Sequence, residues 1–405
     1  MKKYDKYKDS GIEWLGEIPE HWDCLLFKRC MKINNGQDYK DIVNKSGYPV
    51  YGSGGVFAYA NDYLHDGEAL LLGRKGTINR PMYVNEKFWT VDTMFYAIPF
   101  NNICCKYMYY QSLGFPFDLY ATQTAIPSMT QSALNENTVC VPTYDEQCKI
   151  ASYLDDKVSK IESAIAEKES MIEDLQNYRK SVITEAVTHG LNPDVPMKDS
   201  GVEWIGMIPE HWEVSKLKYK STIYNGATPS TSNSKYWDGE YNWATPVDMK
   251  EKYLVSTDKL ITKDGLNSCG THMVEEGTII MSTRAPIGKL AISKIPLCTN
   301  QGCKSICCNK ELYNEFIYYF LFAHVNVLES LGTGSTFMEL SSQNLADFSI
   351  LMPSKEEQIS IASFLITKDE EINNSISEIQ SQIEDLKTYK SSVITEAVTG
   401  KIDLR

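Results

Sequence analysis

The sequence predicts an α+β protein with two mixed, strand-rich domains and two long helices, related by an internal duplication with pseudo-two-fold symmetry. Two pairs of repeats carry this prediction. Segments 173–188 and 384–399 are identical at twelve of sixteen positions, and segments 9–22 and 199–212 at eleven of fourteen. Solenoid and propeller repeats recur roughly every 20 to 50 residues. A period of about 200 residues therefore indicates that one half of the chain has been copied.

The repeats also define the predicted boundaries. The first pair is offset by 211 residues and the second by 190, so the second copy carries about 21 extra residues between its matched ends. We predict six segments: a repeated N-terminal segment (1–22), a first variable domain (23–141), a first helix (142–190), a linker with the second repeated segment (191–212), a second variable domain (213–352) and a second helix (353–405).

The variable domains show the short apolar runs and turn residues that are typical of strands. In the first domain we predict strands and tight loops at 47–55, 67–73 and 83–91, and a helix at 106–112. In the second domain a strand at 277–282 runs into the loop 283–289, which aligns with 73–77 of the first. Both loops are basic and contain glycine. They are expected to occupy matching places with different side chains.

Heptad repeats predict the two long helices. Each begins at a capping box, 143–146 or 354–357, and each is stopped by a glycine, Gly190 or Gly400. Helices of about 44 residues with no second apolar face are expected to pack on each other; pairing between two molecules is the alternative. The seam positions are Ile150, Leu154, Val158, Ile161, Ile165, Lys168, Ile172, Leu175, Arg179, Val182 and Ala186 in the first helix, and Ile361, Leu365, Asp369, Ile372, Ile376, Ile379, Ile383, Leu386, Lys390, Val393 and Ala397 in the second.

Composition indicates a cytoplasmic protein without a membrane partner. No run of about 18 apolar residues occurs, and the N-terminus lacks the apolar core of a signal peptide. The eleven cysteines sit mostly in apolar runs with no C-x-x-C pair, as expected of reduced core residues. One cluster could bind a metal ion, but it lacks paired spacing and a nearby histidine; its members are Cys298, Cys303, Cys307 and Cys308.

The net charge of −13 is unevenly distributed. Residues 23–141 carry ten basic and ten acidic side chains, and residues 213–352 carry thirteen and fourteen. The two variable domains are thus almost neutral, and the repeated segments hold nearly all of the negative charge. Because local clusters set the field that a ligand meets, the whole-chain charge does not exclude an anionic partner such as nucleic acid.

No known catalytic motif is present. The Arg74-Lys75-Gly76 loop lacks the spacing of a phosphate-binding loop, and nucleophile-elbow, zinc-protease, dinucleotide-binding and amino-methyltransferase patterns are missing. His21 and His211 lie in the repeated segments together with four tryptophans, so we interpret them as packing or docking residues. The tryptophans, our candidates for contact with a partner protein, are Trp14, Trp22, Trp204 and Trp212.

Several motifs taken together resemble the specificity subunit of type I restriction–modification enzymes. They are Pro-x-x-x-Glu-Gln at 142–147 and 353–358, the paired Ser-Val-Ile-Thr-Glu-Ala-Val-Thr ends, Gly-Ala-Thr-Pro-Ser at 226–230, Thr-Arg-Ala-Pro-Ile-Gly at 283–288 and Asn-Gln-Gly-Cys-Lys at 300–304. The resemblance covers nearly the whole chain. It implies two target recognition domains held apart by two antiparallel helices, each domain reading one half of a bipartite double-stranded DNA site. It also implies binding to two methyltransferase (modification) subunits and, in the full complex, to restriction subunits.

In that family the chain is a non-catalytic DNA-recognition subunit that binds no cofactor. The complex uses S-adenosylmethionine, and it uses ATP and Mg²⁺ where restriction subunits are present.

Basic, amide and hydroxyl side chains of the variable domains are the candidates for DNA contact, with surface solvation as the alternative for each. They are Arg74, Lys75, Arg80, Gln123, Thr124 and Gln131 in the first domain, and Thr228, Ser230, Arg284, Lys289, Gln301 and Lys304 in the second. A scaffold or adhesion-type protein with two ligand-binding lobes on a coiled coil, and an enzyme in its own right, are the competing hypotheses.

Overall fold

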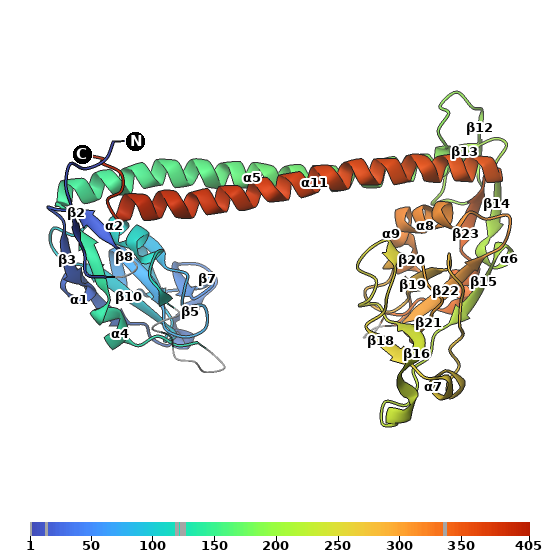
Figure 1. Cartoon of the computed structure of the whole chain (residues 1–405), viewed down its shortest axis with the longest axis horizontal. Coiled ribbons are helices and arrows are strands. Elements are labelled where there is room, and N and C mark those ends of the chain that lie inside the picture. Colours follow the sequence, from blue (N-terminus) through green and yellow to red (C-terminus); the bar gives the residue numbers. More distant parts are fainter. Residues whose placement is uncertain (1, 13–14, 118–120, 122–126, 335–337) are drawn as a thin grey trace. The chain divides into compact units, whose positions relative to one another are not determined.

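The computed structural model of the chain describes residues 2–12, 15–117, 121, 127–334 and 338–405. The chain divides into two compact units (Figure 1). Unit 1 comprises Met1–Glu169 and Ile379–Arg405, and unit 2 comprises Ser170–Glu378. Each unit contains one sheet-rich domain, one repeated segment and a stretch of both long helices. Unit 1 therefore joins the two ends of the chain.

Unit 1 is built on a seven-stranded sheet with the order β4-β10-β8-β9-β6-β7-β5. A separate antiparallel pair, β3 with β11, brings the beginning and end of the domain together. The elements are β1 (Tyr7–Asp9), β2 (Glu17–Pro19), β3 (Asp23–Leu26), α1 (Phe27–Cys30), β4 (Met31–Asn35), η1 (Lys40–Ile42), β5 (Val43–Asn44), β6 (Tyr48–Gly52), β7 (Gly55–Ala60), β8 (His65–Gly73), β9 (Met82–Thr90), β10 (Met94–Pro99), α2 (Cys105–Ser112), α4 (Gln131–Glu136) and β11 (Thr138–Val141).

Unit 2 repeats this plan with a five-stranded sheet, β15-β22-β19-β20-β17, and a three-stranded sheet, β18-β16-β21. Its closing pair is β14 with β23. The elements are β12 (Met197–Asp199), β13 (Met207–Pro209), β14 (Glu213–Lys216), α6 (Leu217–Lys220), β15 (Ser221–Asn225), η2 (Ser234–Tyr236), β16 (Trp237–Ala244), β17 (Tyr253–Leu254), β18 (Lys259–Ile261), α7 (Lys263–Asn267), β19 (Ile279–Ser282), β20 (Leu290–Ser293), β21 (Cys298–Thr299), β22 (Cys303–Cys308), α8 (Asn314–Ala323), α9 (Val325–Ser330), α10 (Ser342–Ala346) and β23 (Ser349–Met352).

The central strands β8 and β19 explain the continuous apolar runs in the sequence. Successive side chains of a strand point to opposite faces. Leu70 and Leu72 accordingly pack in one core cluster and Leu71 in another, and Ile279 and Ile280 divide in the same way. Both faces of each strand are buried, so alternation with polar residues disappears. The predicted strands at 67–73 and 277–282 are confirmed, as is the helix at 106–112.

The long helices are α5 (Tyr144–His189) and α11 (Lys355–Val398), and within each unit their stretches run antiparallel (Figure 1). Gly190 and Gly400 follow them with φ of +79° and +69°, as the predicted stops require. The structure thus supports pairing inside one chain. Three side-chain pairs bridge the helices, and each includes at least one predicted seam position. They are Lys168 Nζ to Gln382 Oε1 (2.6 Å) and Lys390 Nζ to Glu162 Oε1 (3.2 Å) in unit 1, and Arg179 Nε to Asp369 Oδ1 (3.3 Å) in unit 2.

One expectation about the helices is wrong. Near their N-terminal ends the helices do carry a second buried face, because Ala151 and Ala362 lie in the domain cores beside the seam residues. Next to the seam, Gln147 and Gln358 are also buried. The Gln147 Oε1 atom accepts from the backbone N–H of Cys104, just before α2, at 2.9 Å. Each helix is therefore bonded to a domain as well as to its helical partner.

The glutamate of the repeated Glu-Gln pair anchors the repeated segments. Glu146 Oε1 accepts from Trp22 Nε1 at 3.2 Å, and Glu357 Oε1 accepts from Trp212 Nε1 at 3.3 Å. The predicted capping box is formed at α11, where Glu357 exchanges bonds with Ser354. At α5, both oxygens of Glu146 are engaged by the N-terminal segment instead. Among the described residues, no helix is long and apolar enough to cross a bilayer.

Candidate nucleic-acid interface

The two basic loops occupy matching places, as predicted. One follows β8 and the other follows β19, and each contains a glycine with positive φ, Gly76 at +84° and Gly288 at +89°. Each loop is bonded to the segment that precedes a short helix. The N–H of Met129 donates to Arg74 O at 2.9 Å, and the N–H of Leu340 donates to Thr283 O at 2.8 Å. The short helices α4 and α10 begin two residues later.

A third segment lies beside each loop: the end of β4 in unit 1 and the end of β15 in unit 2. Each of these strands ends at an asparagine that is followed by a glycine. A Cβ atom on Gly36 would lie 2.0 Å from Val91 O, and one on Gly226 would lie 1.9 Å from Asn300 O. Only glycine allows this approach, so the two asparagines before them are held at equivalent positions. Asn35 pairs across the sheet with Phe95, and Asn225 with Lys304.

In unit 1 this site is partly aromatic. The Arg74 guanidinium lies 5.8 Å from the centroid of the Phe95 ring, within the range of a cation–π contact, and donates to Asp92 O at 3.3 Å. Gln131 Nε2 donates to Ile33 O at 3.2 Å. A cavity of about 310 Å³ lies between these groups, and Lys75 contributes to its wall. The arrangement exposes cationic and amide donors on a shallow surface.

In unit 2 the same place is polar. Lys304 is only 6% exposed, and its Nζ donates to Asn225 Oδ1 and Ser342 Oγ, each at 2.9 Å. Burial lowers the pKa of Lys304; the charge of Glu339 opposes this change and that of Arg284 adds to it. Arg284 is exposed, and its Nε lies 3.1 Å from Glu339 Oε2.

The remaining candidates are dispersed around the second site. Thr228 donates a hydrogen bond to Gln301, so these two lie together. Ser230 is exposed and contacts the hydroxyl of Ser232, and Lys289 Nζ donates to Pro246 O at 3.4 Å.

In unit 1, Arg80 does not line the cavity beside Arg74. Burial raises the pKa of Tyr109 in α2, and the nearby Arg80 guanidinium opposes that rise. Gln123 and Thr124 lie outside the described residues. Whether any of the twelve candidates touches DNA stays a prediction.

The tryptophan candidates have different surroundings. Trp22 and Trp212 are fully buried and lie against the glycines that end α11 and α5, so their rings have no exposed surface for a partner. Trp204 is half-buried and stacks on Phe348 with ring centroids 5.0 Å apart. These three therefore pack within their own units. Trp14 lies outside the described residues.

Sequence reasoning missed the residues that organise both sites. Asn35 and Asn225 were not singled out as contacts, nor were Ser342 and Glu339, which come close to Lys304 and Arg284 in the fold. Aligning the two halves would have shown that both copies carry Asn-Gly after the first sheet strand. No local signal marks Ser342 or Glu339, because their partners are distant in sequence.

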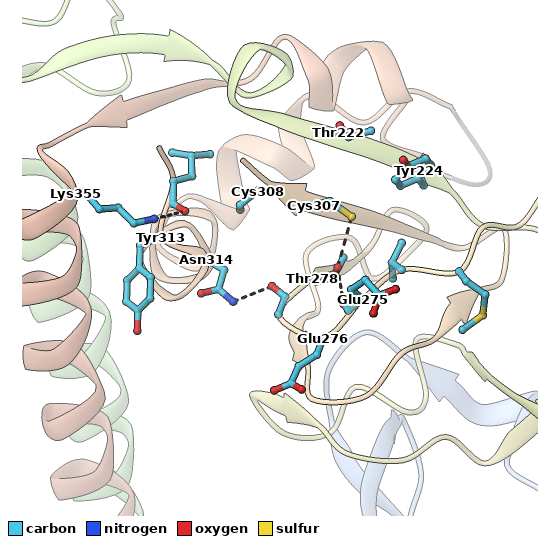
Figure 2. Close-up of a pocket in the computed structure, with 14 residues that line it drawn as sticks. Thr222, Tyr224, Glu275, Glu276, Thr278, Cys307, Cys308, Tyr313, Asn314 and Lys355 are labelled. Atoms are coloured by element: carbon cyan, nitrogen blue, oxygen red, sulfur yellow. Dashed lines mark hydrogen bonds between the residues drawn. The ribbon is translucent and has the colours of Figure 1, made fainter. Parts of the chain in front are cut away.

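A larger cavity of about 530 Å³ lies elsewhere in unit 2 (Figure 2). Its wall includes Cys307 and Cys308, and burial raises the pKa of Cys308 to about 12, so this thiol stays protonated near neutral pH. Lys355 at its rim donates to Leu312 O at 2.7 Å. In the described parts of the chain, no three His, Cys, Asp or Glu side chains are grouped to hold a metal ion. None of the ten candidate contacts that the structure describes lines this cavity.

Comparisons with known proteins agree with this architecture. Residues 28–172 and 209–385 match the family described as Type I restriction modification DNA specificity domain. Over its whole length the chain is 26% identical to the putative type I restriction enzyme MjaX specificity subunit of Methanocaldococcus jannaschii, covering 98% of that protein. It is 37% identical to the MjaIX specificity subunit of the same organism over 175 residues, which are 42% of this chain and 40% of that protein.

Two solved structures share the fold. One is a chain of a structure described as "Structural basis underlying complex assembly and conformational transition of the type I R-M system", with a TM-score of 0.74 and 13% identity over 95% of this chain and 99% of the other. The other is the HsdS subunit from Thermoanaerobacter tengcongensis, with a TM-score of 0.52 and 13% identity over 95% and 98%. At this identity the likeness concerns the fold alone. Because the family match extends over both halves of the chain, the protein belongs to the specificity subunits of type I restriction–modification systems.

Proposed function

We propose that this chain is the sequence-reading, non-catalytic subunit of its complex, and that each domain reads one half of a bipartite DNA site. One observation carries the proposal: two copies of the same loop framework present different side chains at equivalent positions. Phe95 in unit 1 corresponds to Lys304 in unit 2. Base pairs differ in the hydrogen-bonding groups on their major-groove edges. Two domains that read different sequences therefore need the same loop framework with different donor and acceptor side chains.

The near-neutral charge of the variable domains bears on affinity. Phosphate contacts supply most of the non-specific binding energy of DNA-binding proteins. Ten basic and ten acidic residues in 23–141 leave little net attraction. We therefore infer that the isolated chain binds DNA modestly and that methyltransferase subunits, two in each complex, add contacts. Restriction subunits complete the full complex, which acts in the cytoplasm.

The long helices are proposed to set the spacer between half-sites and to help dock the methyltransferase subunits. Both helices have residues in both units, which supports this role. No cofactor is assigned to this chain in the proposal. S-adenosylmethionine belongs to the methyltransferase subunits, and ATP and Mg²⁺ are used where restriction subunits are present.

Selection from a randomised duplex pool tests the proposal. The full chain, purified with its methyltransferase subunits, should enrich a two-part motif with a fixed spacer. Absence of any such motif would remove the DNA-reading function and favour the alternative of a scaffold with two ligand-binding lobes. Methyl transfer by the purified chain alone would instead show that it is an enzyme.

A further inference from the structure

Asn225, at the end of β15, is held by two neighbours. Its Oδ1 accepts from Lys304 Nζ at 2.9 Å and from Ser342 Oγ at 2.7 Å, while Lys304 and Ser342 also lie 2.9 Å apart. The three polar atoms form a closed triangle. Lys304 is almost fully buried beneath Asn225, which is itself exposed. This triangle therefore forms the floor of the candidate interface in unit 2.

The chemistry of lysine decides which way the amide faces. An ammonium group has three donors and no acceptor, so the atom of Asn225 that faces Lys304 must be the oxygen. The NH₂ group then points away from the triangle. The Asn225 Oδ1 atom already accepts two hydrogen bonds. The side chain therefore offers a ligand the two N–H donors of its amide, and its acceptor is occupied.

Arg284 presents the same kind of group nearby. Its Nε faces Glu339 at 3.1 Å, and among the described residues its terminal nitrogens make no other hydrogen bond or ion pair. The charges of Arg284 and Glu339 both act on Lys304, so the two segments are close. Arg284 and Asn225 thus both present nitrogen donors in this part of unit 2, beside the Glu339 carboxylate.

Unit 1 lacks the triangle. The residue across from Asn35 is Phe95, which has no hydrogen to donate, and Gln131, at the first position of α4 as Ser342 is of α10, donates to Ile33 O instead. Within the described residues, the Asn35 side chain has no hydrogen bond that would fix its amide. It keeps both an acceptor and a donor available.

We propose that Lys304 and Ser342 are specificity-positioning residues that lock Asn225 as a pure donor, so that unit 2 reads acceptor atoms at the base facing Asn225. The N7 and O6 acceptors of guanine meet this requirement best. Adenine needs both an acceptor and a donor for the two-bond contact that asparagine makes with its N6 and N7. Asn35 retains that capacity in unit 1. This inference rests on the proposed DNA-reading function and assigns base chemistry to it.

The test uses the full chain with its methyltransferase subunits and a duplex pool randomised in both half-sites. Asn225→Asp is nearly isosteric and keeps an oxygen for Lys304, but it replaces the outward donors by an acceptor. We expect guanine to be lost at one position of one half-site and affinity for the wild-type site to fall about tenfold or more. Unchanged preference in the other half-site serves as the control for correct folding.

Two further variants sharpen the result. Lys304→Met with Ser342→Ala frees the amide oxygen and should admit adenine at that same position. Asn35→Asp, the matched control, should alter only the other half-site.

A wild-type motif that Asn225→Asp leaves intact overturns the inference, as does a wild-type preference for adenine at the affected position. Either result leaves the proposed function standing. A wild-type complex that selects no motif overturns the proposed function, and this inference with it.

Discussion

Removing one heptad from each long helix tests whether the helices set the spacer. The deletion takes out residues 165–171 of α5 and the equivalent residues 376–382 of α11. At 1.5 Å per residue, seven residues correspond to about 10 Å of helix. Removing a whole heptad keeps the seam facing its partner, because the heptad is the repeat of the packing pattern.

The bridging contacts indicate that the shortened helices can still pair. Lys168 and Gln382 bond to each other, and the double deletion removes both. The bridge between Arg179 and Asp369 lies outside the deleted segments and is retained. Deleting 165–171 alone is the matched control. It leaves the two helices unequal, and we expect it to lower the melting temperature more than the double deletion does.

A change of about 10 Å corresponds to roughly three base pairs, since duplex DNA rises 3.4 Å per base pair. The selected motif of the double deletion should keep both half-sites and lose about three base pairs of spacer. Affinity should also fall, because three base pairs are nearly a third of a helical turn and the DNA must twist to meet both domains. A folded double deletion that selects the original spacer would refute the idea that these helices set the distance.

Three other outcomes are expected. Arg74→Ala and Arg284→Ala should each weaken binding by roughly 1–3 kcal/mol if a base is contacted through two bonds, and should flatten preference in one half-site only; unchanged affinity and motif would place both loops away from DNA. Residues 1–198 should self-associate through the exposed seam and, with methyltransferase subunits, read a palindromic site, whereas a monomer on asymmetric DNA would contradict the internal symmetry. Gly190→Ala should cost about 1–2 kcal/mol because its φ is positive, and Gly400→Ala should cost more because the new Cβ would also lie 2.3 Å from a proline ring of β2; equal losses in urea unfolding would contradict this ranking.

Much of the fold was predictable from local patterns. Heptad spacing and terminal glycines predicted both helices, and apolar runs between turn residues predicted the central strands β8 and β19. These features are encoded by residues close in sequence, because a helix or strand is specified by its own periodicity. The duplication also predicted that the loops after Gly73 and Ser282 occupy equivalent positions in the two domains.

The candidate interface was only partly predictable. Arg284 and Lys304 were singled out, but the sequence said nothing of their neighbours Glu339 and Ser342. The sequence also suggested that the repeated tryptophans contact a partner protein, whereas the fold buries Trp22 inside unit 1. Residue type indicates what a side chain can do, whereas burial and partners decide what it is free to do.

The sequence by itself determined the duplicated architecture, the helical pairing seam and the family to which the chain belongs. Only the tertiary structure decided that the N-terminal segment packs with the end of α11 and that Asn225 turns its oxygen inward. The bond from Tyr4 to Glu146 spans 142 positions, and that from Ser342 to Asn225 spans 117. Contacts between residues so far apart produce no repeating pattern in the sequence, because they form only when the order of the strands in the sheets brings the segments together.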